Sequence, residues 1–174
     1  MKKVIVFLLA AALGSITGLA AAFQFEVTQV TDETMMPEFR EGSHVLIDRM
    51  AFEERFGNGK SVERGDVVLF PNMMYTETGE DDRMMKRVIG LPGEWVSISG
   101  GKVYIDGVPL DESEWLREEA LAHVDPDEEM VKRFVDAGQY FVLGDNRRSS
   151  TDSRHETVGM VREKDILGKV IKQW

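Results

Sequence analysis

The stretch WVSISGGKVYIDG, residues 95–107, decides the fold class of this chain. Apolar and polar residues alternate on both sides of Gly100 and Gly101, which is typical of strands with one buried face. Paired glycines supply the positive φ angles of a two-residue hairpin turn, so we expect strands at 96–99 and 102–106. Looser versions of the same pattern predict further strands at 23–27, 44–48, 65–70, 140–143, 158–161 and 166–171. The chain is therefore predicted to be mainly β.

Helical character is confined to two acidic segments, 113–123 and 126–134, and neither has a wide apolar face. Both lie between the hairpin and the next apolar run. We therefore interpret residues 96–138 as a small subdomain inserted into a β core that consists of residues 24–95 and 139–174.

The chain begins with a charge-free run of 20 residues, VIVFLLAAALGSITGLAAAF, at positions 4–23. Such a run is long enough to cross the roughly 30 Å hydrocarbon core as a helix. Lys2 and Lys3 favour an N-terminus inside the cell, with the remaining chain outside. A cleavable secretory signal is the alternative, because Ala20-Ala21-Ala22 resembles a small-residue cleavage site. The length of the run favours a transmembrane anchor at residues 1–23, and in either case the body is exported.

Composition excludes several classes of function. The formal net charge of −10 and the sequence pI of about 4.8 argue against nucleic acid as a partner. The absence of cysteine removes disulfides, thiol nucleophiles and thiolate metal sites. The three histidines do not have the spacing of metal ligands, and no GxSxG nucleophile motif is present.

Four short blocks of sequence carry a family resemblance. They are TMMP at 34–37, GDVVLF at 65–70, KRVIGLPGE at 86–94 and GDNRRSSTDSR at 144–154. The last two blocks are long and specific. In this order, and over residues 25–174, they resemble the bacterial type I signal peptidase family, and the N-terminal anchor fits the same family.

The resemblance implies a signal-peptidase-like β catalytic core with a small inserted subdomain and one N-terminal transmembrane helix. It also implies hydrolysis of the peptide bond that follows the signal sequence of exported preproteins, with no metal or organic cofactor. The expected location is the cell membrane, with a cytoplasmic N-terminus and the catalytic domain on the extracytoplasmic side. The expected partners are preprotein substrates, the lipid bilayer and the secretion translocon.

The chemistry of this family rests on a hydroxyl and a lysine, and the matching residues are Thr34 and Lys86. A hydroxyl needs a base to attack a carbonyl at neutral pH. Lysine, with an ordinary pKa near 10.4, is suited to this only if desolvation disfavours the charged amine by about 4 kcal/mol. The apolar neighbours of Lys86 in the sequence, Met85 and Val88, favour such burial.

Other site residues follow from the resemblance alone. Ser150 stands at the position whose hydroxyl orients the lysine, and Asp152 and Arg154 stand where the family has a supporting ion pair. Met35 and Met85 are candidates to line shallow apolar pockets for small substrate side chains.

The chain departs from the family at the nucleophile, where Thr34 replaces serine. The additional methyl group restricts χ1 of the side chain. Asp32 stands where family members tend to have glycine or serine that helps to bind the oxyanion, and Glu33 follows it. Two carboxylates there would raise the pKa of Lys86 and repel a developing oxyanion.

Three hypotheses follow from these observations. The first is a hydroxyl–lysine signal peptidase, and the second is a catalytically impaired homologue that acts as a binding or assembly factor for exported proteins. The third is a signal-cleaved, secreted β domain without a peptide-related function.

Overall fold

A computed structural model of the chain describes residues 24–52, 61–72, 83–122 and 124–174. The predicted anchor at 1–23 lies outside these residues. Within the described ranges, no helix combines the length and the apolar character needed to cross a bilayer. The elements are β1 Phe25–Gln29, β2 His44–Asp48, β3 Val67–Pro71, β4 Arg83–Gly90, β5 Trp95–Ser99, β6 Lys102–Ile105, β7 Val108–Pro109, α3 Glu118–Ala122, β8 Met130–Phe134, β9 Gln139–Leu143, β10 Val161–Arg162, η2 Glu163–Asp165 and β11 Gly168–Gln173.

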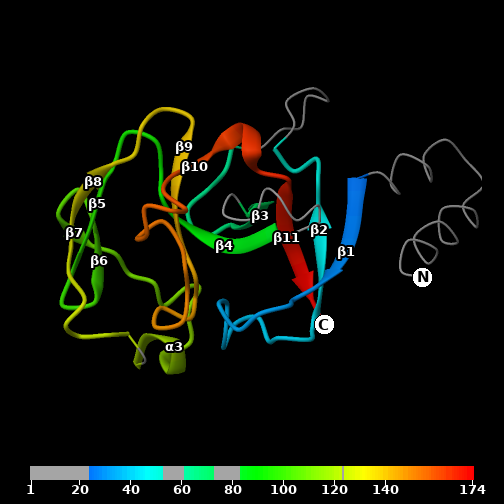
Figure 1. Ribbon diagram of the computed structural model, residues 1–174, viewed down its shortest axis with the longest axis horizontal. Coiled ribbons are helices and arrows are strands. Elements are labelled where there is room, and N and C mark those ends of the chain that lie inside the picture. Colours follow the sequence, from blue (N-terminus) through cyan, green and yellow to red (C-terminus); the bar gives the residue numbers. More distant parts are fainter. Residues whose placement is uncertain (1–23, 53–60, 73–82, 123) are drawn as a thin grey trace, which may run out of the picture.

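Seven strands form the larger sheet, in the order β1-β2-β11-β3-β4-β9-β10. Every pairing in it is antiparallel. The C-terminal strand β11 lies between β2 and β3, so the two ends of the described chain meet in one sheet (Figure 1). The prediction of a mainly β fold is confirmed.

The smaller sheet has the strand order β7-β6-β5-β8 and lies on the left of Figure 1. Its centre is the β5–β6 hairpin, in which Val96 pairs with Ile105 and Ser99 with Lys102. The turn glycines have φ angles of 56° and 71°, as the sequence predicted. This sheet occupies much of the segment that we interpreted as an insert.

Three clusters of buried side chains form the core. Two belong to the larger sheet, one around Val68 and Val142 and the other around Met35 and Ile47. The third contains residues of β4, β5, β6 and β9 and therefore joins the two sheets. Gly90 is part of this junction, because a Cβ atom there would lie 2.5 Å from Val96 Cγ2.

Two local predictions are wrong. Residues 130–134 form strand β8, not a helix, and Trp95 pairs with Phe134. The helix expected at 113–123 is reduced to Glu118–Ala122. Both segments are polar and short, so their helical propensity is weak. In residues 130–134, pairing with β5 outweighs this propensity and gives a strand.

The strand expected at 158–161 is also mostly a turn. The carbonyl of His155 accepts hydrogen bonds from the amides of Val158 and Gly159, at 3.2 and 2.9 Å. Strand β10 begins only at Val161.

Candidate active site

Lys86 lies in the middle of β4, and its side chain is only 1% exposed. Alternate residues of a strand share a face, so Lys86 lies between Met84 and Val88, and Val68 of β3 is its directly paired neighbour. All three of these neighbours belong to one apolar cluster. The stem of the lysine is therefore enclosed by apolar side chains.

The amine of Lys86 meets the hydroxyl of Thr34, although the two residues are 52 positions apart. Lys86 Nζ donates a hydrogen bond to Thr34 Oγ1 over 2.7 Å. Thr34 Oγ1 in turn donates to Asp32 Oδ1 over 2.7 Å, and the same carboxylate oxygen accepts from the backbone amide of Thr34 at 3.0 Å. The three side chains thus form one chain of hydrogen bonds.

Burial lowers the pKa of Lys86 below its ordinary value of 10.5. The carboxylates of Asp32, Asp152 and Asp145 act in the opposite direction, and the guanidinium of Arg154 lowers the pKa further. Because the net direction is downward, the amine is more easily neutral than an exposed lysine. A neutral amine at 2.7 Å from a hydroxyl is able to accept its proton.

The loop after β9 holds the backbone of Thr34. Asn146 N donates to Thr34 O over 3.0 Å, and Asn146 Nδ2 donates to Glu33 O over 3.1 Å. Ser149 Oγ donates to the carboxylate of Glu33 over 2.6 Å. Gly144 passes so close that a Cβ atom on it would lie 2.6 Å from Thr34 O. These contacts fix the segment that presents the hydroxyl.

Ser150 is buried beside this glycine, and a Cβ atom on Gly144 would lie 2.1 Å from Ser150 Oγ. Within the described part of the chain, Ser150 Oγ has no hydrogen-bond partner of good geometry. The structure therefore brings Ser150 to the site, and its predicted function of orienting Lys86 remains a prediction.

Asp152 and Arg154 form an ion pair with two contacts of 2.8 Å. The side chain of Asp152 is fully buried, and its Oδ2 also accepts from the backbone amide of Gly144 at 3.0 Å. Burial alone would raise the pKa of Asp152, but the hydrogen bonds and charge of Arg154 outweigh it, so the pKa is lowered. Arg154 also contacts Glu128 at 2.7 Å, which links the loop to the smaller sheet.

Sequence reasoning did not identify two further buried ion pairs around the site. Arg87 binds the carboxylate of Asp145 through two contacts of 2.8 and 2.6 Å. Arg147 binds Glu112 through both of its terminal nitrogens. Burial raises the pKa of Asp145 despite the opposing effect of Arg87. Three of these four residues lie inside the sequence blocks that carry the family resemblance. Membership of these blocks was therefore the feature of the sequence that could have pointed to the ion pairs.

Met35 and Met85 both pack in the second apolar cluster of the larger sheet. Met35 is fully buried, and Met85 packs against the same cluster from a partly buried position. Their assignment to a substrate pocket remains a prediction.

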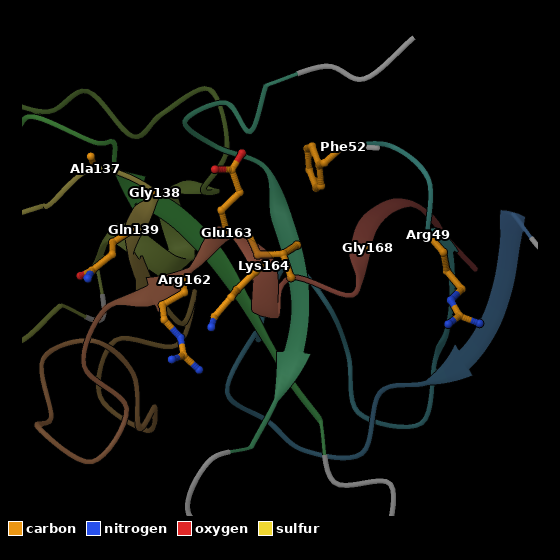
Figure 2. A pocket seen from close by; sticks show the side chains of 10 residues that line it. Arg49, Phe52, Ala137, Gly138, Gln139, Arg162, Glu163, Lys164 and Gly168 are labelled. Atoms are coloured by element: carbon orange, nitrogen blue, oxygen red, sulfur yellow. The ribbon is translucent and has the colours of Figure 1, made fainter. Parts of the chain in front are cut away.

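Two of the hollows in the surface of the described residues are lined by different sets of residues. One, of about 560 Å³, is lined by residues that include Arg49, Phe52, Arg162 and Lys164 (Figure 2). Thr34 and Lys86 are not among the residues that line it. The other, of about 980 Å³, is lined in part by Ser150. Of the two, this second hollow borders the loop that holds Thr34.

Comparisons with known proteins identify the family of the chain. The family model "Signal peptidase, peptidase S26" matches residues 1–174. Signal peptidase I V of Bacillus subtilis (strain 168) is 37% identical over 151 residues, which cover 82% of this chain and 81% of that protein. Signal peptidase I of Leptolyngbya laminosa is 30% identical over 156 residues, which cover 87% and 70% of the two chains.

A solved structure is similar as well. The crystal structure of a signal peptidase I from Enterococcus faecalis V583 is 34% identical, with a TM-score of 0.51 over 65% of this chain and 98% of that one. These matches support a hydrolase of the serine-peptidase type. The chain belongs to the signal peptidase family, peptidase S26.

We expect Asp152→Asn to destabilise the protein, because it leaves the buried guanidinium of Arg154 without its main counter-charge. Breaking a buried pair costs about 3–5 kcal/mol, which corresponds to a fall in Tm of roughly 6 °C or more for a chain of this size. Since the pKa of Asp152 is lowered in the folded state, its contribution is present above the ordinary value of 3.8 and is lost in acid. The difference between native and variant should therefore narrow as the pH falls through the folded pKa.

The matched control for this prediction is Asp165→Asn, which breaks the exposed pair between Asp165 and Arg162. It should change the stability by no more than about 1 kcal/mol. Thermal melts of the purified protein measure both effects. An unchanged melting curve together with lost activity in Asp152→Asn would make Asp152 a direct participant in the reaction.

Proposed function

We propose that the chain is a membrane-anchored signal peptidase I-like endopeptidase that removes signal peptides from exported preproteins. Thr34 is the nucleophile and Lys86 is its base. The observation that carries the proposal is the 2.7 Å contact between Lys86 Nζ, buried in an apolar sheet, and Thr34 Oγ1. Family membership supports the class of substrate.

The reaction follows from this contact. Neutral Lys86 accepts the hydroxyl proton as Thr34 Oγ1 attacks the carbonyl carbon of the scissile bond. The tetrahedral intermediate collapses, the C–N bond breaks, and Lys86 returns the proton to the leaving amine. A water molecule then attacks the carbonyl carbon of the Thr34 ester and gives a proton to Lys86. The bond to Thr34 Oγ1 breaks, Lys86 returns the proton to this oxygen, and the signal peptide leaves with a free carboxylate.

The surrounding residues have supporting functions in this proposal. Ser150 orients Lys86, and the Asp152–Arg154 pair stabilises the loop that carries Ser150. Met35 and Met85 contribute to apolar pockets for small substrate side chains. No metal or organic cofactor takes part.

The location follows the sequence prediction. Residues 1–23 anchor the chain in the lipid bilayer with the N-terminus in the cytoplasm, and the catalytic domain lies on the extracytoplasmic side. Preproteins reach it as they leave the secretion translocon, and nucleic acid is not a partner.

Substitution of the two reacting residues tests the mechanism. Thr34→Ala and Lys86→Met should each lower the cleavage of a purified preprotein by about 10³-fold or more, because each removes one half of the proton transfer. Thr34→Ser should raise kcat with little change in KM, since it keeps the hydroxyl and frees χ1. Mass spectrometry of the products measures the rate and the bond that is cut.

Thr31→Ala, which changes an exposed threonine of the same segment, is the matched control and should cleave at the native rate. If Thr34→Ala cleaves as fast as the native chain, Thr34 is not the nucleophile. Binding of preproteins without cleavage by the native chain would favour the impaired homologue.

The pH dependence of cleavage follows from the pKa of Lys86. Only the neutral amine accepts a proton, so kcat/KM should rise with pH to an alkaline plateau. The midpoint should lie below 10.5, because burial lowers the pKa of this lysine. A rate that stays flat between about pH 6 and 10 would contradict the function of Lys86 as the base.

The anchor prediction is tested by intact mass. Protein purified from membranes should retain residues 1–23, because the charge-free run is longer than the apolar part of a cleavable signal. Tryptic peptides that begin at the processed N-terminus are the second readout. A mature N-terminus at Phe23 would identify the segment as a secretory signal instead.

A further inference from the structure

The hydroxyl of Thr34 has a single proton, which it donates to Asp32, because an ionised carboxylate only accepts hydrogen bonds. A hydroxyl group donates once and accepts up to twice. Thr34 Oγ1 donates to Asp32 Oδ1 and accepts from Lys86 Nζ, both over 2.7 Å. Lys86 becomes the proton acceptor only after the hydroxyl rotates away from Asp32. Asp32 and Lys86 therefore compete for the same proton.

The same carboxylate oxygen also engages the backbone amide of Thr34, at 3.0 Å. In serine-type peptidases the amide of the nucleophile is one of the donors that stabilise the oxyanion. One oxygen of Asp32 thus holds both donors of Thr34, the hydroxyl and the amide. Neither donor is available to a substrate while these hydrogen bonds persist.

We propose that Asp32 is a positioning residue that holds Thr34 in a resting arrangement, which a substrate must displace before attack. The inference rests on the proposed function, in which Thr34 is the nucleophile. Asp32 itself is exposed, so its carboxylate can exchange Thr34 for water when it turns away. The carbonyl oxygen of the substrate then accepts from the freed amide, and the freed hydroxyl donates to Lys86.

The charges around Lys86 make the pH dependence of the reaction a second measurement of the effect of Asp32. The carboxylates of Asp32, Asp145 and Asp152 raise its pKa, and the guanidinium of Arg154 lowers it. Removal of Asp32 should therefore move the midpoint of the pH–rate profile to lower pH. This shift reports the removal of the charge, whereas the comparison of Asp32→Ala with Asp32→Asn reports the hydrogen bonds.

The experiment compares Asp32→Ala and Asp32→Asn with the native full-length protein in detergent. Asp32→Ala removes both hydrogen bonds and the charge, whereas Asp32→Asn removes the charge and keeps an acceptor oxygen. Two rates are measured: kcat/KM for a preprotein, and the rate of labelling by a small fluorophosphonate. In the labelling reaction Thr34 Oγ1 bonds to phosphorus, fluoride leaves, and Lys86 takes the hydroxyl proton. Peptide mapping verifies the site of labelling.

We expect Asp32→Ala to raise both rates about tenfold, since hydrogen bonds to a charged group are worth at least that factor in an equilibrium constant. Asp32→Asn should lie between Asp32→Ala and native. Glu41→Ala removes an exposed carboxylate of the same segment and should match the native rates and pH midpoint.

The other outcomes distinguish a failure of the inference about Asp32 from a failure of the proposed function. If the native chain cleaves and Asp32→Ala raises neither rate, the inference is overturned and the proposed function stands. If Asp32→Asn equals Asp32→Ala, the charge alone slows the reaction, and the hydrogen bonds do not hold Thr34. If no variant cleaves but Asp32→Ala labels Thr34 faster, the inference stands and the signal peptidase proposal fails. If Thr34 is neither labelled nor active in any variant, both fail.

Discussion

The hydrogen bond between Lys86 Nζ and Thr34 Oγ1 joins the two groups that carry the proposed reaction. An ammonium group enclosed by Met84, Val88 and their neighbours loses hydration, which favours its neutral form. Nearby carboxylates limit this effect without reversing it, so the pKa of Lys86 stays below its ordinary value. The apolar sheet and the acidic residues around it therefore have opposite effects on the pKa of Lys86, and together they set how basic its amine is.

The loop after β9 positions the segment that contains Thr34. Its glycine, Gly144, leaves room for Thr34 and Ser150, and its amide binds the buried carboxylate of Asp152. Asn146 holds the carbonyl of Thr34 from the other end. Because one short segment contacts both Thr34 and Glu33, small movements of this loop would change the position of the nucleophile directly.

Sequence reasoning predicted the local features and missed those that depend on distant partners. The hairpin at Gly100-Gly101 follows from turn chemistry alone and is confirmed. Strand β4 carries no alternating pattern, since Lys86 and Arg87 are buried through contacts with Thr34 and Asp145, far away in the chain. For the same reason no spacing rule joins Thr34 to Lys86, and only the family resemblance placed them in one site. Neither the local sequence patterns nor the family resemblance predicted the hydrogen bonds of Asp32.

The strand order also has a consequence for how the larger sheet is held together. Thr34 precedes β2 and Lys86 lies in β4, but β2 does not pair with β3 directly, because β11 lies between them. Strand β11 pairs with β2 on one side and with β3 on the other. The C-terminal strand therefore sets the register between the half of the sheet that follows Thr34 and the half that contains Lys86.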